Sequence, residues 1–447
     1  MAGLTRFLPT YRNIWILSFP LIIASISETV VNITDAIFLS RYGTTELAAL
    51  GLAETIYAMA LFLILGFVDG IQITIGRRAG EERHRQIGRV LNQGLYILAG
   101  VSALMVLLVL FAVPLATIEL FQSGEIHRAV ESYLDIAIFG LFFHAFNLAL
   151  SAFYVGISRT RVFIGATLVL AGVNILLDYL LIFGNHGFRE MGIEGAAIAS
   201  LCAEAAFSLF ILIDIIRRRY IPLYGLFVFE KWNHTMAKTL AVLSAPVSME
   251  VLVESVRWFL FFLIIEQLGE EALAIATIIF SCYALLLIPI DAFAETICSM
   301  VSNLIGQKDE KEVGKLVFKT VKLGYLTIVP VLILTLFFPE TVLAIFSPDE
   351  AMIEGAVATL MVIVLATMVA VPADIIGSSV AGTGDTTASL VIEIVVSLFV
   401  LGYAYYAALI AGFSLSSIWF AEVIGWIVCL LLSWLWLQSN YWKRLTI

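Results

Sequence analysis

The chain has 447 residues, of which 61% are hydrophobic and only 13% carry a charged side chain, and its mean hydropathy is +1.01. Soluble domains are nearer half apolar and a quarter charged, so this composition excludes an ordinary water-soluble protein and indicates one that folds in lipid. The formal net charge of −10, without a basic tail or a basic aromatic stripe, also argues against nucleic acid as a partner.

Twelve apolar segments, each long enough to cross a bilayer as a helix, follow one another along the chain. A spanning helix needs about 20 mostly apolar residues. The predicted spans are 13–38, 47–76, 89–113, 130–156, 162–184, 192–216, 239–267, 272–304, 316–338, 352–381, 387–411 and 415–438. The sequence therefore predicts an all-α integral membrane protein of twelve transmembrane helices, with the lipid bilayer as its surroundings.

The basic residues of the loops predict how these spans are oriented. Of the 25 Lys and Arg residues, 21 lie in the two ends or in loops on the same side as the ends, and only three lie in loops on the other side. Loops rich in Lys and Arg stay in the cytoplasm. We therefore expect a multi-pass protein of the cell membrane with both termini in the cytoplasm.

The chain also repeats itself. A shift of 226 residues aligns Leu17–Pro20 with Leu243–Pro246 and Gly156 with Gly382, without a gap between them. The shift moves six helices, an even number, so both halves have the same orientation, as in transporters built from parallel repeats. The prediction is two pseudo-symmetric six-helix bundles. Their bounds are an N-lobe at 1–219, a cytoplasmic linker at 220–236 and a C-lobe at 237–447.

Polar residues in the first and fifth spans recur at helical spacing. A charge at the bilayer centre costs about 2.5–3.5 kcal/mol on insertion scales, so each one indicates a function or a polar partner. Glu28, Asn32 and Asp35 follow one face of the first span, and Asn174 and Asp178 lie one turn apart in the fifth. Two carboxylates and an amide oxygen suit a proton or a Na⁺ ion, because hard cations prefer oxygen ligands. Hydrogen bonds that cross-link helices are the alternative. Glu28 and Asn32 are assigned to substrate binding or coupling.

A second group of charged residues is divided between the halves. Under the 226-residue shift Glu254 coincides with Glu28 and Glu295 coincides with Asp69, while Arg257 lies one turn after Glu254. We predict that Asp69, Glu254, Arg257 and Glu295 serve substrate binding or coupling. A structural ion pair explains Glu254 and Arg257 equally well, and positions near water explain Asp69 and Glu295 equally well. The isolated polar residues of other spans are interpreted as local contacts: His144, Glu204, Glu393 and Glu422.

Patterns of enzyme chemistry are absent from the sequence. It has no G-x-x-x-x-G-K-[ST] loop for a nucleotide, no H-E-x-x-H zinc pattern and no nucleophile with a neighbouring base. The sequence therefore predicts that the protein is not an enzyme. It also predicts no cofactor other than H⁺ or Na⁺ as a coupling ion.

Short segments along the chain form an ordered set. The segments are Asp35–Gly43 with Glu46–Gly51, Gly156–Arg161 with Asn174–Gly184, Met191–Ser200, and Ala381–Thr386. In this order they resemble the multidrug and toxic compound extrusion (MATE) family of transporters, over nearly the whole chain and most strongly in its N-terminal half. The resemblance implies an antiporter that exports small amphipathic, often cationic, organic compounds in exchange for H⁺ or Na⁺.

The resemblance also implies where cations bind. It places a cation site of the N-lobe at Asp35, Asn174 and Asp178, including Na⁺ if that is the coupling ion, with Ser200 as a neighbouring hydroxyl group. Glu254 matches an acid of the seventh helix that some family members use in a C-lobe cation site.

This chain departs from the family pattern at several positions. The tenth-helix acid that accompanies the C-lobe site in those members would fall near Ala370, and Asp374 is one turn away. Arg257 is an unusual cation for the family. An alternative function is a flippase for lipid-linked precursors, which related duplicated folds perform. A flippase would favour a cleft rich in Arg and Lys for the pyrophosphate, whereas Arg257 stands nearly alone among acids.

Overall fold

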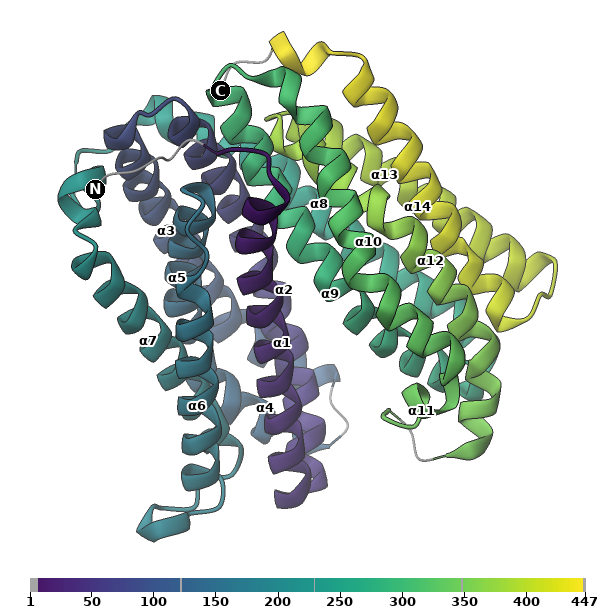
Figure 1. The fold of residues 1–447 in the computed structure, drawn as a ribbon. Helices are drawn as coiled ribbons and strands as arrows, with labels where there is room; N and C mark the ends of the chain where they lie inside the picture. The colour runs from purple at the N-terminus through teal and green to yellow at the C-terminus, as the bar shows by residue number, and fades with distance from the viewer. Residues whose placement is uncertain (1–6, 121–122, 229, 347–348, 445–447) are drawn as a thin grey trace. The chain divides into compact units, whose positions relative to one another are not determined.

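The structure is a computed structural model that describes residues 7–120, 123–228, 230–346 and 349–444, and these residues are almost entirely helical (Figure 1). The helices of the first half are α1 (Tyr11–Tyr42), α2 (Thr44–Gly80), α3 (His84–Leu120), α4 (Gly124–Ala137), α5 (Gly140–Gly156), α6 (Val162–Leu181) and α7 (Ile193–Arg217). Those of the second half are α8 (His234–Glu266), α9 (Glu270–Gly306), α10 (Val313–Phe337), α11 (Pro339–Leu343), α12 (Glu350–Gly382), α13 (Thr386–Tyr405) and α14 (Leu415–Gln438). Short 3-10 or π-helical turns occupy Asn185–Gly187, Ile221–Gly225, Glu310–Glu312, Tyr406–Ile410 and Tyr441–Arg444.

All twelve predicted spans fall on helices. Within the described residues, ten helices are long and apolar enough to cross a bilayer, and the pair α4 and α5 makes an eleventh. The helix α8, 33 residues long, occupies the predicted span 239–267. Large apolar side chains such as Leu107, Phe318 and Leu326 remain exposed on the helices, as a lipid solvent allows and water does not. The chain is therefore a multi-pass membrane protein.

The fourth predicted span, 130–156, differs from the prediction. It was expected to be one continuous helix, but α4 ends at Ala137 and α5 begins at Gly140, with a bend of 48° between them. Glycine is the poorest helix former after proline, so Gly140 marks a weak point at the break. The prediction of a single helix is wrong here, because apolar composition does not determine whether a helix axis bends.

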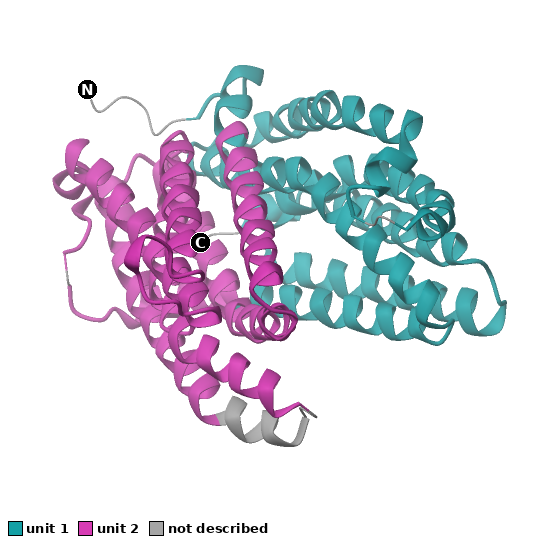
Figure 2. Ribbon diagram, turned by 90° about the horizontal axis from the view of Figure 1, so that it is seen from below, with its two compact units in different colours: residues 1–18, 245–447 teal, residues 19–244 magenta. Residues whose placement is uncertain are grey.

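The described chain divides into two compact units (Figure 2). Residues 19–244 form one unit, called the N-unit below, and residues 1–18 together with 245–447 form the other, called the C-unit. Each change of unit occurs inside a helix, just before Pro20 in α1 and just before Pro246 in α8. Proline lacks the N–H that would bond to the preceding turn, so each helix has an interruption there. The predicted bounds of the two lobes and of the linker stay a prediction.

In the N-unit, α2 packs against α3, α4 and α5, and α6 packs along α7. The closest approaches depend on glycine. A Cβ atom on Gly88 of α3 would lie 2.2 Å from the carbonyl oxygen of Tyr224, and one on Gly156 would lie 2.5 Å from Cγ2 of Ile75. Any larger residue at Gly88 would therefore push the backbone of α3 away from the backbone at Tyr224.

The segment predicted as a linker is fastened to α3. Asn92 Nδ2 donates to the carbonyl oxygens of Gly225 at 3.1 Å and of Val228 at 3.0 Å, and the Phe227 N–H donates to Asn92 Oδ1 at 2.9 Å. An irregular segment leaves backbone groups without helical partners, and each needs another one. The amide of Asn92 satisfies three of them.

In the C-unit, α12 contacts α9, α10 and α14. The contact with α9 is close, since a Cβ atom on Gly382 would lie 2.4 Å from the carbonyl oxygen of Cys298. The segment that begins at Phe7 contacts this unit, since the Phe7 N–H donates to Asn303 Oδ1 on α9 at 3.2 Å. The last residue of α9, Gly306, ends the helix two residues before Lys308 turns the chain at a positive φ of 61°.

Candidate functional site

Three polar side chains of the N-unit meet between α1 and α6. Asp35 on α1 is 4% exposed, and Asn174 and Asp178 on α6 are fully buried. The nitrogen and oxygen of an amide are distinguished by their partners. With its nitrogen facing the acids, Asn174 donates to Asp35 Oδ1 at 3.0 Å and to Asp178 Oδ2 at 3.2 Å. Both carboxyl groups accept from the same amide nitrogen, so Asp35 and Asp178 lie next to each other. The structure therefore brings together the three residues that the sequence grouped.

The fourth residue of the predicted site lies beside the same amide. In the orientation just described, the amide oxygen of Asn174 faces Ser200 Oγ on α7 at 3.4 Å. Asp178 Oδ1 is buried without a hydrogen-bond partner. A buried carboxylate oxygen without a partner is costly unless a proton or a cation binds to it. The two carboxylates, the amide and the hydroxyl group thus offer a set of oxygen atoms that fits H⁺ or Na⁺. Their role as cation ligands stays a prediction.

Sites for transition metals are a separate question. Nowhere in the described ranges are three or more His, Cys, Asp or Glu side chains placed to hold a metal ion together. A Na⁺ ion at Asp35 and Asp178 would therefore also need the amide and hydroxyl oxygens as ligands.

The residues of the polar stripe predicted on α1 interact with two separate groups of side chains. Asp35 faces Asn174 and Asp178, whereas Glu28, two turns earlier, interacts electrostatically with His144 and Glu204. Glu28 and Asn32 are both exposed on the N-unit, and Asp69 on α2 is half-buried. Helical spacing places Glu28, Asn32 and Asp35 on one face of α1, but it does not determine which neighbouring helix each of them meets.

A second polar network of the N-unit joins α5 to α7. His144 Nδ1 lies 2.8 Å from Glu204 Oε1, and Asn147 Nδ2 donates to Glu204 Oε2 at 2.6 Å. Ser208 Oγ in turn donates to Asn147 Oδ1 at 2.6 Å. The prediction that His144 and Glu204 are isolated is wrong, because partners 60 residues apart are paired only by folding. The available signal was the spacing of His144 with Asn147 and of Glu204 with Ser208, which puts each pair on one helix face.

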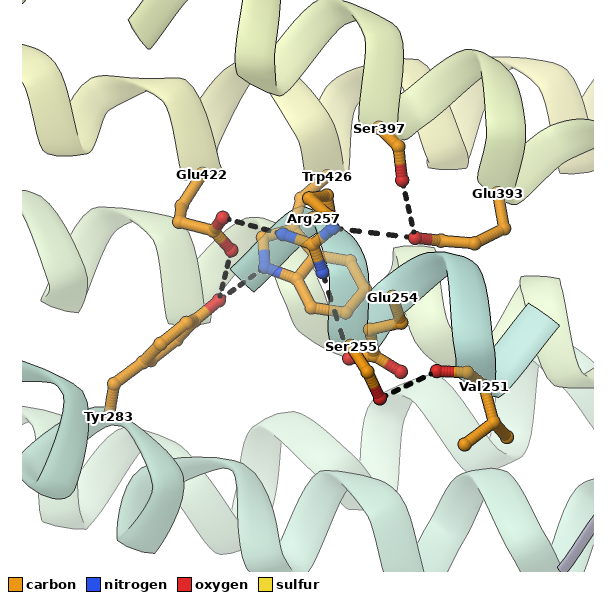
Figure 3. A network of polar contacts seen from close by, with 9 residues as sticks. All are labelled: Val251, Glu254, Ser255, Arg257, Tyr283, Glu393, Ser397, Glu422 and Trp426. Carbon is orange, nitrogen blue, oxygen red and sulfur yellow. Dashed lines mark hydrogen bonds and ion pairs between the residues drawn. The ribbon is translucent and has the colours of Figure 1, made fainter. Parts of the chain in front are cut away.

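In the C-unit, the buried Arg257 of α8 binds three carboxylates (Figure 3). Its Nη1 lies 2.9 Å from Glu422 Oε1 on α14, its Nε lies 3.4 Å from Glu393 Oε1 on α13, and its Nη2 lies 3.6 Å from Glu254 Oε1. Glu422 is 3% exposed, whereas the side chain of Glu254 is 53% exposed. The ion pair of Glu254 with Arg257 is present, but Glu422 is the closest partner. The prediction that Glu393 and Glu422 are isolated is wrong, since they reach Arg257 from other helices.

Aromatic side chains surround this ion-pair cluster. The Tyr283 hydroxyl of α9 donates to Glu422 Oε2 at 3.5 Å, and Trp426 Nε1 donates to the Tyr283 hydroxyl (Figure 3). The guanidinium carbon of Arg257 lies 5.0 Å from the centroid of the Trp258 ring. These contacts offset part of the cost of burying the charges. The cluster thus holds a fixed cation inside the C-unit.

Further acids of the C-unit lie near this cluster. Asp291 of α9 interacts electrostatically with Asp374 of α12 and with Glu254 and Glu295. Glu295 is exposed and Asp374 is half-buried. Acids from α8, α9 and α12 are thus close enough to influence one another, and Arg257 lies one turn from Glu254.

A family model described as MatE matches the chain twice, at residues 20–180 and at residues 246–406. The second match begins 226 residues after the first, which is the shift that the internal repeat predicted. The two matches cover a large majority of the chain.

Curated relatives and solved structures give the same result. The chain is 22% identical over 379 residues to a probable multidrug resistance protein NorM of Thermotoga maritima, covering 85% of this chain and 81% of that protein. It is 24% identical over 340 residues to a probable multidrug resistance protein NorM of Brucella suis, covering 74% and 70%. A solved outward-facing structure of a multidrug resistance MATE family transporter has a TM-score of 0.90 at 22% identity, over 99% of this chain and 98% of that one. The predicted fold, twelve helices in two bundles, is confirmed by this likeness.

Proposed function

The chain belongs to the MatE family of transporters, and we propose that it is a cation-coupled antiporter. It exchanges H⁺ or Na⁺ for small amphipathic organic compounds, which it exports by alternating access. The relatives' names, multidrug resistance proteins, support small organic substrates. We infer no enzymatic activity and a place in the cell membrane, with both termini in the cytoplasm because the basic loops lie on that side.

The observation that carries this proposal is the buried cluster of Asp35, Asn174 and Asp178. Two adjacent carboxylates in an apolar environment repel each other unless a proton or a Na⁺ ion neutralises one of them. Asp178 Oδ1 has no hydrogen-bond partner, so a bound cation would find a free oxygen there. Binding or release of the cation changes the charge between α1 and α6, and with it the packing of the two helices. The Ser200 hydroxyl group and the Asn174 amide would complete the oxygen ligands.

Coupling requires that the cation and the compound prefer different states of the protein. Cation entry from outside neutralises the carboxylates and favours the state that releases the compound outward. A membrane potential supplies about 2.3 kcal/mol per elementary charge per 100 mV, so one or two cations drive a useful accumulation gradient. The acids of the C-unit make cationic compounds the favoured substrates, since Arg257 neutralises only part of their charge.

The test is transport in liposomes that contain a pH-sensitive and a sodium-sensitive dye. Efflux of a fluorescent cationic compound is measured under an imposed H⁺ or Na⁺ gradient for the wild-type protein, for Asp35→Asn and for Glu125→Gln. Glu125 is an exposed carboxylate in the first turn of α4 and serves as the matched control. We expect gradient-driven efflux in the wild type and in Glu125→Gln, and its loss in Asp35→Asn.

Other outcomes contradict specific parts of the proposal. Efflux that persists unchanged in Asp35→Asn would overturn the assignment of the cation site. Absence of efflux under either gradient would overturn the antiport, and flipping of lipid-linked precursors would be assayed next. The engagement of Arg257 by three carboxylates argues against that alternative, because its guanidinium is not free for a pyrophosphate.

A further inference from the structure

Equivalent glutamates of the two repeats each interact with a basic side chain. Glu28 and Glu254 are related by the shift of 226 residues that both the sequence repeat and the family matches give. In the N-unit, Glu28 interacts electrostatically with His144 and Glu204. In the C-unit, Glu254 pairs with Arg257. The two bases differ in one chemical respect. A histidine gains and loses its proton near neutral pH, whereas an arginine remains charged at every physiological pH.

The hydrogen bonds at His144 determine which nitrogen exchanges the proton. His144 Nδ1 faces Glu204 Oε1 at 2.8 Å, so the neutral ring keeps its proton on Nδ1 and donates it to the carboxylate. The other oxygen of Glu204 accepts from Asn147 at 2.6 Å, which keeps the carboxylate ionised and fixed. An added proton therefore binds to Nε2. The bond between α5 and α7 is made in both protonation states, so proton uptake does not separate the helices.

The titratable groups that interact with this pair come from further helices. Glu28 belongs to α1, and Tyr57 belongs to α2, where its ring meets that of His144 edge to face at 6.4 Å. When both glutamates are ionised and His144 is protonated, the three groups together carry one negative charge. With His144 neutral, they carry two. Proton exchange at one nitrogen thus doubles the negative charge that a cationic compound meets at the exposed Glu28.

We propose that His144, Glu204 and Glu28 form a second proton-binding site of the N-unit, separate from the cluster at Asp35. Glu28 and Asp35 are two turns apart on α1, about 10 Å along a helix that rises 1.5 Å per residue. The site rests on the proposed function for its role in transport: protonation of His144 weakens the hold on a cationic compound, and deprotonation strengthens it. Its ability to bind a proton does not depend on that function.

The C-unit suggests the decisive variant. In His144→Arg the base becomes a permanent cation, as Arg257 is beside Glu254, so a cation still faces Glu204 but no nitrogen titrates. His144→Gln removes the charge instead. His234→Gln, at an exposed histidine in the same unit, is the matched control. Protons bound by the purified protein are counted by titrating weakly buffered detergent solutions between about pH 5 and pH 9, around the ordinary histidine pKa of about 6.5.

We expect His144→Arg and His144→Gln each to take up one proton fewer than the wild type over this pH range. In the double variant Asp35→Asn/His144→Arg, the loss of bound protons is expected to equal the sum of the losses in the two single variants. A second measurement compares His144→Arg with the control, His234→Gln. Adding the cationic compound is expected to release a proton from the wild type and from His234→Gln, and to release fewer protons from His144→Arg. A compound that binds to both proteins but releases as many protons from His144→Arg as from the wild type would overturn the proposal.

A spectroscopic measurement keeps the proposal testable if a variant fails to fold. The chain has five histidines, and in protein with ¹³C-labelled histidine the ring signal of His144 is identified by its loss in His144→Gln. We expect that signal to titrate within the same pH range and its midpoint to move in Glu28→Gln. A His144 ring signal that does not change with pH would overturn the site. Loss of coupling in Asp35→Asn tests the proposed function separately, since neither the proton count nor the ring signal of His144 depends on that function.

Discussion

Replacing Arg257 with methionine is expected to destabilise the C-unit strongly, because it leaves Glu422 buried without a counter-ion. Glu422 is 3% exposed, and its closest partner is the guanidinium at 2.9 Å. Breaking a buried ion pair by removing one partner costs about 3–5 kcal/mol. In a unit of about 200 residues this corresponds to roughly 2–4 °C of melting temperature per kcal/mol, or a loss of about 6–20 °C. Methionine has a similar length and keeps the packing against Trp258.

The double variant Arg257→Met/Glu422→Gln separates the missing charge from missing packing. It removes both charges, and replacing a buried ion pair with uncharged residues of similar volume is often neutral. Thermal unfolding in detergent is therefore expected to show most of the stability restored. Glu254→Gln is the matched control, since this carboxylate is 53% exposed at 3.6 Å and contributes below about 1 kcal/mol. A double variant as unstable as the sum of the two single variants, or an Arg257→Met as stable as the wild type, would refute the reasoning.

Two further changes test the packing of α3 in the N-unit. Gly88→Ala is expected to prevent folding or lower the yield of folded protein, because its Cβ would lie 2.2 Å from the Tyr224 carbonyl oxygen. Gly100 has open space around it, so Gly100→Ala is expected to leave the stability unchanged or raise it slightly in a thermal unfolding assay. Asn92→Ala removes three hydrogen bonds to the 225–228 segment, at about 1 kcal/mol each. Limited proteolysis is expected to cleave that segment faster in this variant, and an unchanged rate would show that other contacts hold it.

The helical spans were predictable because their cause is local. A run of about 20 apolar residues has one stable form in lipid, so composition alone located all twelve segments. The bend between Ala137 and Gly140 was not predictable in the same way. It depends on how α4 and α5 each pack against α2 and α7, and those contacts are distant in the sequence. The change of unit inside α1 and α8 escaped prediction for the same reason.

The candidate sites, too, were predictable only where their cause is local in the sequence. Asp35, Asn174 and Asp178 were grouped because the two α6 residues share a helix face and because the family resemblance supplied the partner from α1. Helical periodicity gives the face that a residue occupies, but it does not give the helix opposite. Glu204, the partner of His144, and Glu393 and Glu422, two of the partners of Arg257, lie on other helices, and the resemblance did not supply these partners. A charged residue that stands alone in a span therefore indicates a partner on another helix more reliably than it indicates a local contact.

The two repeats differ at the polar cluster of the N-unit. The C-unit residues equivalent to Asp35, Asn174 and Asp178 are Phe261, Val400 and Ala404, all buried. Phe261 packs against the Trp419 ring with centroids 5.1 Å apart, so an apolar core takes the place of the carboxylate cluster. At these positions the C-unit has nothing to protonate. Beside the equivalent glutamates, too, the C-unit holds a cation that never titrates, while the N-unit holds one that does. If the Asp35 cluster and His144 bind protons as we propose, changes of charge at these two places are confined to the N-unit, whereas in the C-unit Arg257 links α8 to α13 and α14 by ion pairs.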